Sequence, residues 1–502
     1  MRRDCVLAGA VAALAALLCG LAAPVASGDI TTPMSVQWTF SMGPDATNLT
    51  VPVVREDRVY VSRNGILHCL DGATGGQQWQ FKPDPGDVTT GPVVFRDLVV
   101  VGANDSGLYG LKAATGAVVW RVGCSGPIAP TPIIVNGLLM LAANQMVYAV
   151  DPSTGAVSWI CAMNAPAAYG PATDEAGSMI YFVGQDGSVQ CIDATAGRYR
   201  WAALLRTGPR FSPPVVAGGR VIVASGKRVY GVARSGGIAY AAEMLAGVGA
   251  PAAVDNRLYV PSVDGSIYIL SARSGAVVER KTPYNVEHAL TSSPVVTDAY
   301  VVVGSADGLV FAFDRATGAG KWIYRCRAPE QLPNEGANYG IYAPLLVTDG
   351  ALLCVTGSGD LYRFSASAPD GSGPVFGDFE PQPGSAMPGG NYVGPVCSVV
   401  DDGSGVDAAS VQATVDGSPV PVTFEVATGK VALRPAPVPD GPHVVKVVAR
   451  DYRGNEASTE WSFVTDVTIV PEQQPGAPGQ PGMPTRPGTQ TLRGRQAAPR
   501  AR

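Results

Sequence analysis

Histidine, serine and aspartate are the residues of this chain that could together carry out hydrolysis. A serine hydrolase needs a histidine base beside its nucleophile, and the sequence has only 3 histidines, His68, His288 and His443. His68 falls in a packing position of a strand, His288 in a loop, and His443 in a separate C-terminal region. Neither a Gly-x-Ser-x-Gly elbow nor a His-Glu-x-x-His helix is present. The sequence therefore predicts no catalytic, cofactor-binding or metal-binding residue.

Cysteines are the second group that could carry chemistry. Two of the 9, Cys5 and Cys19, lie in an N-terminal segment that we expect to be removed. The remainder is odd in number, so at least one thiol of an exported chain is unpaired or paired with another chain. Cys124, Cys161 and Cys326 each follow a tryptophan closely. A disulfide between Cys124 and Cys161 is one option, and the sequence leaves the pairing of these three open.

Acidic turns are the third group. The Asp-Gly pairs at 186–187, 264–265 and 307–308 lack the twelve-residue ligand pattern of a calcium loop and are explained as tight hairpin turns. With 61 Gly, 42 Pro and only 15% charged residues, the composition favours many short strands joined by turns. A net charge of -5 argues against a nucleic-acid partner.

The elements that position these residues are copies of one unit, an apolar strand followed by Asp-x-x-Thr-Gly-x-x-x-Trp, clearest from Ala149 to Trp159. The turn glycines recur every 38 to 43 residues, the length of a four-stranded propeller blade, at Gly75, Gly116, Gly155, Gly197, Gly237, Gly275 and Gly318. The motif is degenerate in two copies, where Ala241 and Glu279 occupy the tryptophan position. A proline opens each of eight units, at Pro52, Pro92, Pro132, Pro171, Pro214, Pro251, Pro294 and Pro344.

The eighth unit ends without a tryptophan, and the N-terminal strand Val36 to Phe40 has a tryptophan, Trp38, but no unit of its own. We therefore expect Trp38 to complete the eighth blade, which closes the ring and removes an open sheet edge. The predicted fold is all-β, an eight-bladed β-propeller over residues 28–366.

The phrase from Ala149 to Trp159 and its copies resemble the pyrroloquinoline-quinone-type propeller repeat over residues 31–366. The resemblance implies that the tryptophans are structural and dock each blade on the next, at Trp38, Trp79, Trp120, Trp159, Trp201 and Trp322. The repeat serves quinoprotein dehydrogenases and also non-enzymatic propellers similar to the lipoprotein of the outer-membrane β-barrel assembly machine. The dehydrogenases often place two adjacent cysteines over the quinone, and no two cysteines are adjacent here. The resemblance therefore implies a scaffold with no cofactor.

The longest connection between units runs from Trp322 to Pro344, and long loops on rigid scaffolds are common binding sites. Its polar residues form the candidate partner loop, namely Arg325, Arg327, Glu330, Asn334, Glu335, Asn338 and Tyr339. The alternative is a tolerated insertion. A second candidate is the segment from Lys281 to His288.

Residues 1–27 have two arginines, an apolar run and small residues near Ser27, which predicts a cleaved secretory signal peptide. An uncleaved membrane anchor is the alternative, whereas Leu18 disfavours lipidation at Cys19. No second apolar run of spanning length follows. The chain is therefore expected to be exported, to the periplasm, the cell surface or the medium.

The C-terminal third is divided into a Pro/Gly-rich linker (367–392), a β-sandwich (393–466) and a disordered Pro/Gly/Arg tail (467–502). The phrase from Asp440 to Asn455 resembles the closing hairpin of bacterial immunoglobulin-like modules, which implies a spacer domain. Cys397 has no partner cysteine in that domain. The favoured function is an exported non-enzymatic scaffold that binds a protein or envelope partner. The alternatives are a quinone-dependent dehydrogenase and a polysaccharide-binding surface protein.

Overall fold

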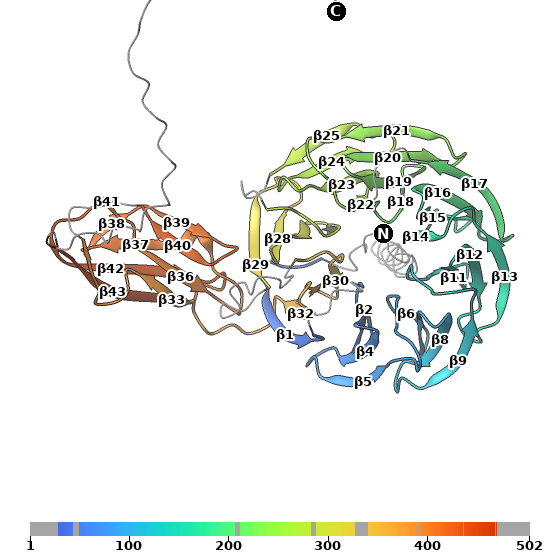
Figure 1. Cartoon of the computed structure of the whole chain (residues 1–502), viewed down its shortest axis with the longest axis horizontal. Coiled ribbons are helices and arrows are strands. Elements are labelled where there is room, and N and C mark those ends of the chain that lie inside the picture. Colours follow the sequence, from blue (N-terminus) through green and yellow to red (C-terminus); the bar gives the residue numbers. More distant parts are fainter. Residues whose placement is uncertain are drawn as a thin grey trace, which may run out of the picture.

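Eight four-stranded antiparallel sheets, here called blades, stand in a ring around one axis, and a second set of sheets lies beside the ring (Figure 1). The computed structural model describes residues 29–43, 50–205, 211–282, 288–326, 340–388, 392–434, 436–466 and 468. The predicted all-β propeller fold is confirmed. The predicted signal peptide and nearly all of the predicted tail lie outside the described residues.

Blades 1 to 4 follow one another in the chain, and each runs from its inner to its outer strand. Their strands are β2 (Val53–Arg55), β3 (Arg58–Arg63), β4 (Ile66–Asp71) and β5 (Gln77–Phe81); β6 (Val93–Phe95), β7 (Leu98–Gly102), β8 (Gly107–Lys112) and β9 (Val118–Gly123); β10 (Ile133–Val135), β11 (Leu138–Ala143), β12 (Met146–Val150) and β13 (Val157–Ala162); β14 (Ala167–Thr173), β15 (Met179–Gly184), β16 (Ser188–Asp193) and β17 (Arg198–Leu204).

Blades 5 to 8 continue the ring. Their strands are β18 (Val215–Ala217), β19 (Arg220–Ser225), β20 (Arg228–Ala233) and β21 (Ile238–Glu243); β22 (Ala252–Val254), β23 (Arg257–Pro261), β24 (Ile267–Ser271) and β25 (Val277–Lys281); β26 (Val295–Val296), β27 (Tyr300–Gly304), β28 (Leu309–Asp314) and β29 (Gly320–Arg325); β30 (Leu346–Thr348), β31 (Ala351–Val355) and β32 (Asp360–Ser365) with β1 (Ser35–Ser41). β1 pairs antiparallel with β32, so the N-terminal strand is the outer strand of blade 8, as the position of Trp38 predicted.

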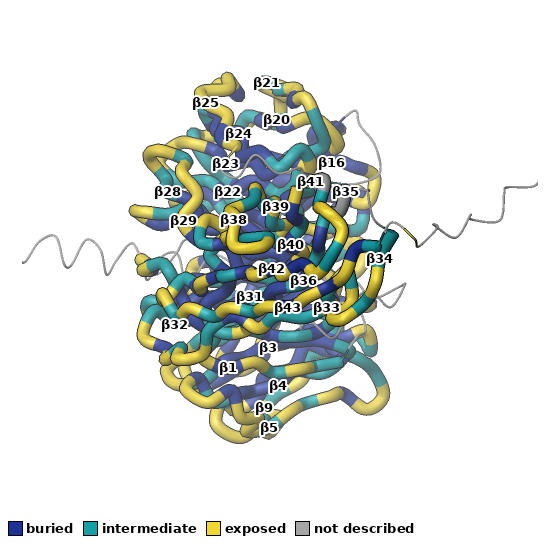
Figure 2. The backbone as a smooth tube through the Cα atoms, turned by 90° about the vertical axis from the view of Figure 1, so that its left-hand side faces the viewer, coloured by how far each residue is buried: buried dark blue, intermediate teal, exposed yellow. Residues whose placement is uncertain are grey.

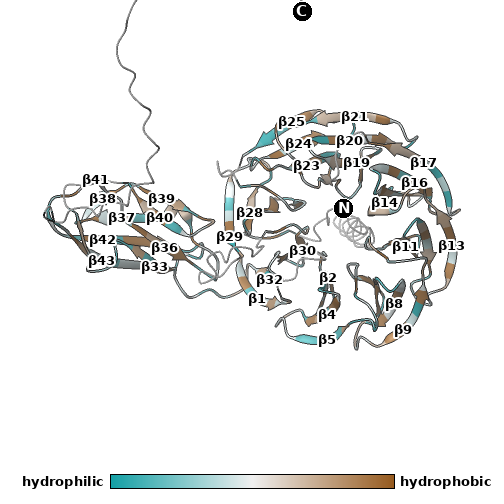
Figure 3. Ribbon diagram, viewed as in Figure 1, coloured by the Kyte–Doolittle hydropathy of each residue, from teal (hydrophilic) through white to brown (hydrophobic). Residues whose placement is uncertain are grey.

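The core of the ring lies between blades. Alternate residues of each middle strand face opposite neighbours, so every blade contributes to the packing on both of its sides. Figure 2, in which the ring is seen edge-on behind the sandwich, shows buried segments in the interior and exposed segments at the periphery. Figure 3 shows the same gradient in hydropathy, from apolar inner strands to polar stretches on outer strands such as β5 and β25.

The tryptophan of one blade packs on the turn of the next. A methyl group added at Gly75 would lie 2.7 Å from Trp38, and one at Gly116 would lie 2.6 Å from Trp79. The indole N–H of Trp38 donates to the carbonyl oxygen of Gly72 at 2.9 Å. Both turn glycines have positive φ, which a side chain disfavours. The motif is therefore a mechanical joint between blades.

Strands β33 to β43 form a second unit, here called the sandwich. One sheet has the order β33-β36-β40-β39 and the other the order β34-β43-β42-β37-β38, with a separate β35-β41 pair. The elements are β33 (Val375–Glu380), β34 (Ala386–Pro388), β35 (Tyr392–Val393), β36 (Val396–Val400), the 3-10 helix η1 (Ala408–Ser410), β37 (Gln412–Val415), β38 (Ser418–Val420), β39 (Val422–Glu425), β40 (Lys430–Leu433), β41 (Ala436–Pro437), β42 (Gly441–Arg450) and β43 (Glu456–Asp466). Its relation to immunoglobulin-like modules stays a prediction.

The predicted linker 367–392 is wrong in part. β33 pairs with β36, and β34 pairs in parallel with β43, so residues 375–388 include two strands of the sandwich. Both are edge strands, where prolines such as Pro388 are tolerated because one side of the strand makes no ladder bonds. The Pro/Gly content that suggested a linker is thus compatible with sheet edges.

Candidate binding site

The three histidines form no accessible catalytic centre among the described residues. His68 is buried, its Nδ1 contacts the Gln77 side chain at 3.0 Å, and burial lowers its pKa. His443 contacts Asp416 at 2.7 Å and Thr465 at 3.0 Å, but the threonine hydroxyl donates to the Pro439 carbonyl and is buried. A buried hydroxyl with its proton already engaged cannot serve as a nucleophile toward an external substrate.

His288 pairs with Asp307, and this hydrogen bond raises the pKa of the histidine. The nearby Ser305 hydroxyl donates to Asp307 and is fully buried. The carboxylate thus separates the serine from the histidine, which is the wrong order for a base to activate the serine. This part of the second candidate segment is a structural bridge, and residues 283–287 lie outside the described residues.

Two joints of the ring use residues that the sequence motif did not identify. In blade 5 the docking residue is Tyr240, whose hydroxyl donates to the Ala272 carbonyl at 2.9 Å, not Ala241. In blade 6 it is Lys281, whose ammonium donates to the Ala316 carbonyl at 2.8 Å, while Glu279 holds the register position and forms an ion pair with that ammonium at 2.9 Å. The turn glycine that faces Trp201 is Gly236 rather than Gly237. The turn is one residue shorter there, and a constant-length motif therefore missed it.

The eighth joint is made by the sandwich. The turn after β32 lacks the Asp-x-x-Thr-Gly docking motif, and the indole N–H of Trp322 donates instead to the Ser404 carbonyl at 2.9 Å. The Tyr324 hydroxyl donates to the Asp402 carbonyl at 2.9 Å. The loop 401–405 reads Asp-Asp-Gly-Ser-Gly and shares the Asp-to-Gly spacing of the docking turn Asp71 to Gly75. Its geometry differs, because Trp322 bonds the third residue after the Asp and Gly405 faces Ile323 and Tyr324. We call residues 401–405 the capping loop, since it occupies the place of the missing docking turn.

The capping loop also touches the N-terminal strand, because the Val36 N–H donates to the Gly403 carbonyl at 3.0 Å. Arg453 of the sandwich donates to the Ser35 hydroxyl at 3.0 Å. The sandwich therefore contacts both β29 and β1, the two outer strands that flank the closure of the ring (Figure 1). This seam was not predicted, although the repeated Asp-x-x-x-Gly spacing was available in the sequence.

Arg325 belongs to this seam. Its guanidinium donates to the Ala427 carbonyl at 3.4 Å, and it lines a small pocket with residues such as Val399 and Phe424. The first residue of the candidate partner loop is therefore directed at the sandwich. The remaining candidates, Arg327, Glu330, Asn334, Glu335, Asn338 and Tyr339, lie outside the described residues, and their role stays a prediction.

Three carboxylates meet behind the capping loop. Oxygen atoms of Asp370, Asp401 and Asp451 lie within 4.8 Å of one another, a spacing that could hold a cation. Asp401 accepts the N–H groups of Gly403 and Gly405, and Asp451 accepts those of Arg453 and Asn455. These bonds explain both residues as turn residues, so the cluster alone does not define a metal site.

Asp401→Asn is expected to raise the free energy of unfolding near neutral pH by about 1 kcal/mol. Burial, with Asp370 and Asp451 adding repulsion, raises the pKa of Asp401 to about 6. When the pKa of a carboxyl is higher in the folded chain than in the unfolded chain, the free energy of unfolding falls as the pH rises from about 4 to about 6. Denaturation at several pH values in EDTA measures the difference from the parent, which should vanish near pH 4. An equal gain at all pH values, or a gain with the exposed Asp298→Asn control, would contradict the charge argument.

The outer strands of blades 2 to 6 expose apolar side chains. Each of these strands pairs on one side only, so its other edge is open in the described part of the chain. Leu204 is 59% exposed, and the others are Val118, Val119, Val157, Ile160, Ile238, Val277 and Val278. The sandwich leaves this side of the ring free (Figure 1). We call this surface the apolar rim.

The ring of docked blades defines the class of the protein, a propeller of pyrroloquinoline-quinone-type repeats. The family model described as "Outer membrane protein assembly factor BamB" matches residues 35–167, 143–279 and 228–368. The chain belongs to this family. No described helix is long and apolar enough to cross a membrane.

Individual relatives differ in the functions that their names state. BamB of Yersinia pestis is 24% identical over 331 residues, which is 60% of this chain and 80% of the relative. The serine/threonine-protein kinase AfsK of Streptomyces griseus is 28% identical over 275 residues, which is 52% of this chain but only 33% of the kinase. The structure of quinohemoprotein alcohol dehydrogenase from Comamonas testosteroni has a TM-score of 0.53 at 15% identity, covering 77% of this chain and 87% of that one. At that identity the structural likeness shows the fold alone.

Proposed function

We propose that the chain is an exported, non-enzymatic scaffold whose propeller holds a protein partner of the cell envelope. The proposal rests on the structural role of the repeat-motif residues. The tryptophans, with Tyr240 and Lys281 in their place, serve as joints between blades and leave the rim and the loops for binding. Rigid joints under variable loops suit a binding scaffold. The family is named for an outer membrane protein assembly factor, which also supports a role as a binding scaffold.

The apolar rim is one surface that such a partner would cover, because apolar side chains beside open strand edges favour addition of a partner strand. A photo-crosslinking residue at Leu204 or Ile238 tests this in the native envelope. We expect a discrete crosslinked species at these two positions and none at Glu175, which is exposed on a turn of blade 4. Equal crosslinking at all three positions would contradict a defined partner surface on the rim.

The candidate partner loop provides a separate prediction. Replacing residues 328–338 with a Gly/Ser segment of equal length is expected to reduce partner capture several-fold, because the polar groups of the loop are lost. If the loop serves binding and not folding, the melting temperature should stay within about 2 °C of the parent. The control replaces the exposed turn residues Glu175 and Ala176 with Gly and Ser. Unchanged capture by the loop variant would show that the segment is a tolerated insertion.

A quinone-dependent dehydrogenase is the second candidate, because 150 residues of the chain are 26% identical to the quinohemoprotein alcohol dehydrogenase of Comamonas testosteroni. Titration of the purified chain with pyrroloquinoline quinone and calcium, followed by quinone absorbance and dye reduction with alcohols, separates the two functions. The scaffold predicts neither saturable binding nor turnover. Tight binding with turnover would overturn it.

A further inference from the structure

Cys326 and Cys354 meet at the seam between blades 7 and 8. Cys326 directly follows β29, and its N–H donates to the Gly308 carbonyl at 2.9 Å. Cys354 lies in β31, opposite Tyr362 of β32. Their exposed fractions are 1% and 0%. Both cysteines are therefore held by regular backbone bonds, in the interior of the ring.

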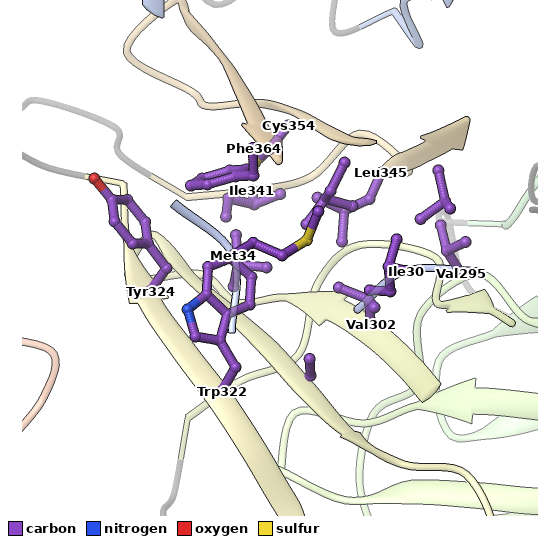
Figure 4. Close-up of a cluster of buried hydrophobic side chains, with 14 of the residues drawn as sticks. Ile30, Met34, Val295, Val302, Trp322, Tyr324, Ile341, Leu345, Cys354 and Phe364 are labelled. Atoms are coloured by element: carbon purple, nitrogen blue, oxygen red, sulfur yellow. The ribbon is translucent and has the colours of Figure 1, made fainter. Parts of the chain in front are cut away.

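The two side chains belong to one core cluster between the facing sides of these blades. Trp322, Tyr324 and Cys326 alternate along the chain onto the same side of blade 7. Figure 4 shows Cys354 beside Phe364 of blade 8, across from Tyr324 and Trp322. The thiol of Cys326 lies within hydrogen-bonding reach of the Cys354 sulfur. A disulfide requires the two sulfurs to approach to about 2.05 Å.

No other pair of described cysteines is placed in this way. Cys69, Cys161, Cys191 and Cys397 belong to four different clusters, and Cys124 packs against a fifth. Cys124 and Cys161 lie on opposite sides of blade 3, so the structure gives no support to a bond between them. All seven are thiols in the structure. One bond would leave five unpaired, in agreement with their odd number.

We propose that Cys326 and Cys354 form a disulfide that joins blade 7 to blade 8 in the exported protein. The inference rests on the proposed function in one respect, namely that export brings the chain into an oxidising compartment. The two thiols lose two protons and two electrons as the S–S bond forms. The electrons reduce the disulfide of a thiol–disulfide exchange partner, such as an oxidoreductase or oxidised glutathione, to two thiols.

The bond must form before the blades close. Burial and the neighbouring Cys354 raise the pKa of Cys326 well above its ordinary value, so the reactive thiolate is scarce in the folded ring. No exchange partner reaches sulfurs that are this deeply buried. The bond, once formed, closes residues 326–354 into a covalent loop at the closure of the ring. Constraint of the unfolded chain then stabilises the folded one.

The test uses the full chain purified from the exported fraction. The protein is denatured in iodoacetamide without reductant, and the labelling of each cysteine is measured by peptide mass spectrometry. We expect Cys326 and Cys354 to be unlabelled and recovered as one linked peptide pair, two hydrogens lighter than the reduced pair. Cys69, Cys191 and Cys397 should be labelled. Labelling of both Cys326 and Cys354 would overturn the proposal.

Failure of export is distinguished by fractionation. If the chain is found only in the cytoplasm, the exported scaffold is contradicted. The purified chain is then refolded in a glutathione redox buffer, where the same bond must form.

A second readout is the melting temperature. Reductant present during refolding should lower the melting temperature by roughly 5 °C. Cys354→Ala should be insensitive to reductant, whereas the buried control Cys191→Ala should keep the parent's response. A parent that is insensitive would also overturn the proposal.

Discussion

Trp322→Ala is expected to lower the free energy of unfolding by about 3 to 5 kcal/mol and to release the sandwich from the ring. Trp322 is fully buried, with ring centroids 5.4 Å from Phe364 and 5.9 Å from Tyr324. Truncation leaves a cavity between blades 7 and 8, at the closure of the ring. It also leaves the Ser404 carbonyl without its indole donor. Both losses fall on one seam, which makes this tryptophan more costly to remove than the half-buried Trp79.

Equilibrium unfolding in denaturant and limited proteolysis measure the two consequences separately. We expect faster cleavage in residues 367–374, between β32 and β33, because the capping loop no longer ties the sandwich to β29. Trp322→Phe is the matched variant. It keeps most of the aromatic packing and loses the hydrogen bond, so its cost should be about 1 to 2 kcal/mol. If Trp322→Ala changed stability no more than Trp79→Ala and left proteolysis unaltered, the sandwich would not be part of the closure.

The sequence was sufficient to predict the ring because the signal is periodic. Strand alternation, the turn glycines and the docking tryptophans recur at one spacing, and even the completion of blade 8 by β1 follows from an unpaired Trp38. Repetition makes each copy evidence for the others. A unit that occurs once, such as the sandwich, provides no such check. This is why its edge strands β33 and β34 were mistaken for a linker.

The seam was missed for a different reason. A docking position requires a long side chain that packs on the turn of the next blade, and its terminal donor usually reaches a turn carbonyl, although the buried Trp159 indole N–H does not. This requirement is geometric rather than tied to residue type. Tyr240 and Lys281 satisfy it as Trp79 does, through a hydroxyl or an ammonium in place of the indole N–H. The capping loop, which belongs to the sandwich and not to a blade, supplies the carbonyl that accepts the Trp322 N–H. A motif restricted to Asp and Trp detects neither substitution, because the sequence does not show which turn carbonyl a side chain reaches.

Gly75→Ala is expected to destabilise the chain by about 3 kcal/mol, the second large effect. Gly75 has φ +73, and a methyl group there would lie 2.7 Å from the Trp38 ring. Left-handed backbone costs an L-residue about 1 to 2 kcal/mol, and displacement of the indole from its turn adds the loss of its bond to Gly72. Because Trp38 comes from the N-terminal strand, the change opens the ring where blade 8 meets blade 1.

Gly137→Ala separates the two contributions. Gly137 has φ +80 and nothing within 4 Å of an added methyl group, so this variant carries the backbone cost alone, about 1 kcal/mol. Denaturant unfolding of both variants measures the difference, and the tryptophan emission of each folded variant, compared with that of the parent, reports whether Trp38 moves. If Gly75→Ala and Gly137→Ala cost the same, the joint adds nothing beyond backbone conformation. A larger cost at Gly75, with a shifted tryptophan emission, would locate the stability of the closed ring in the docking contact itself.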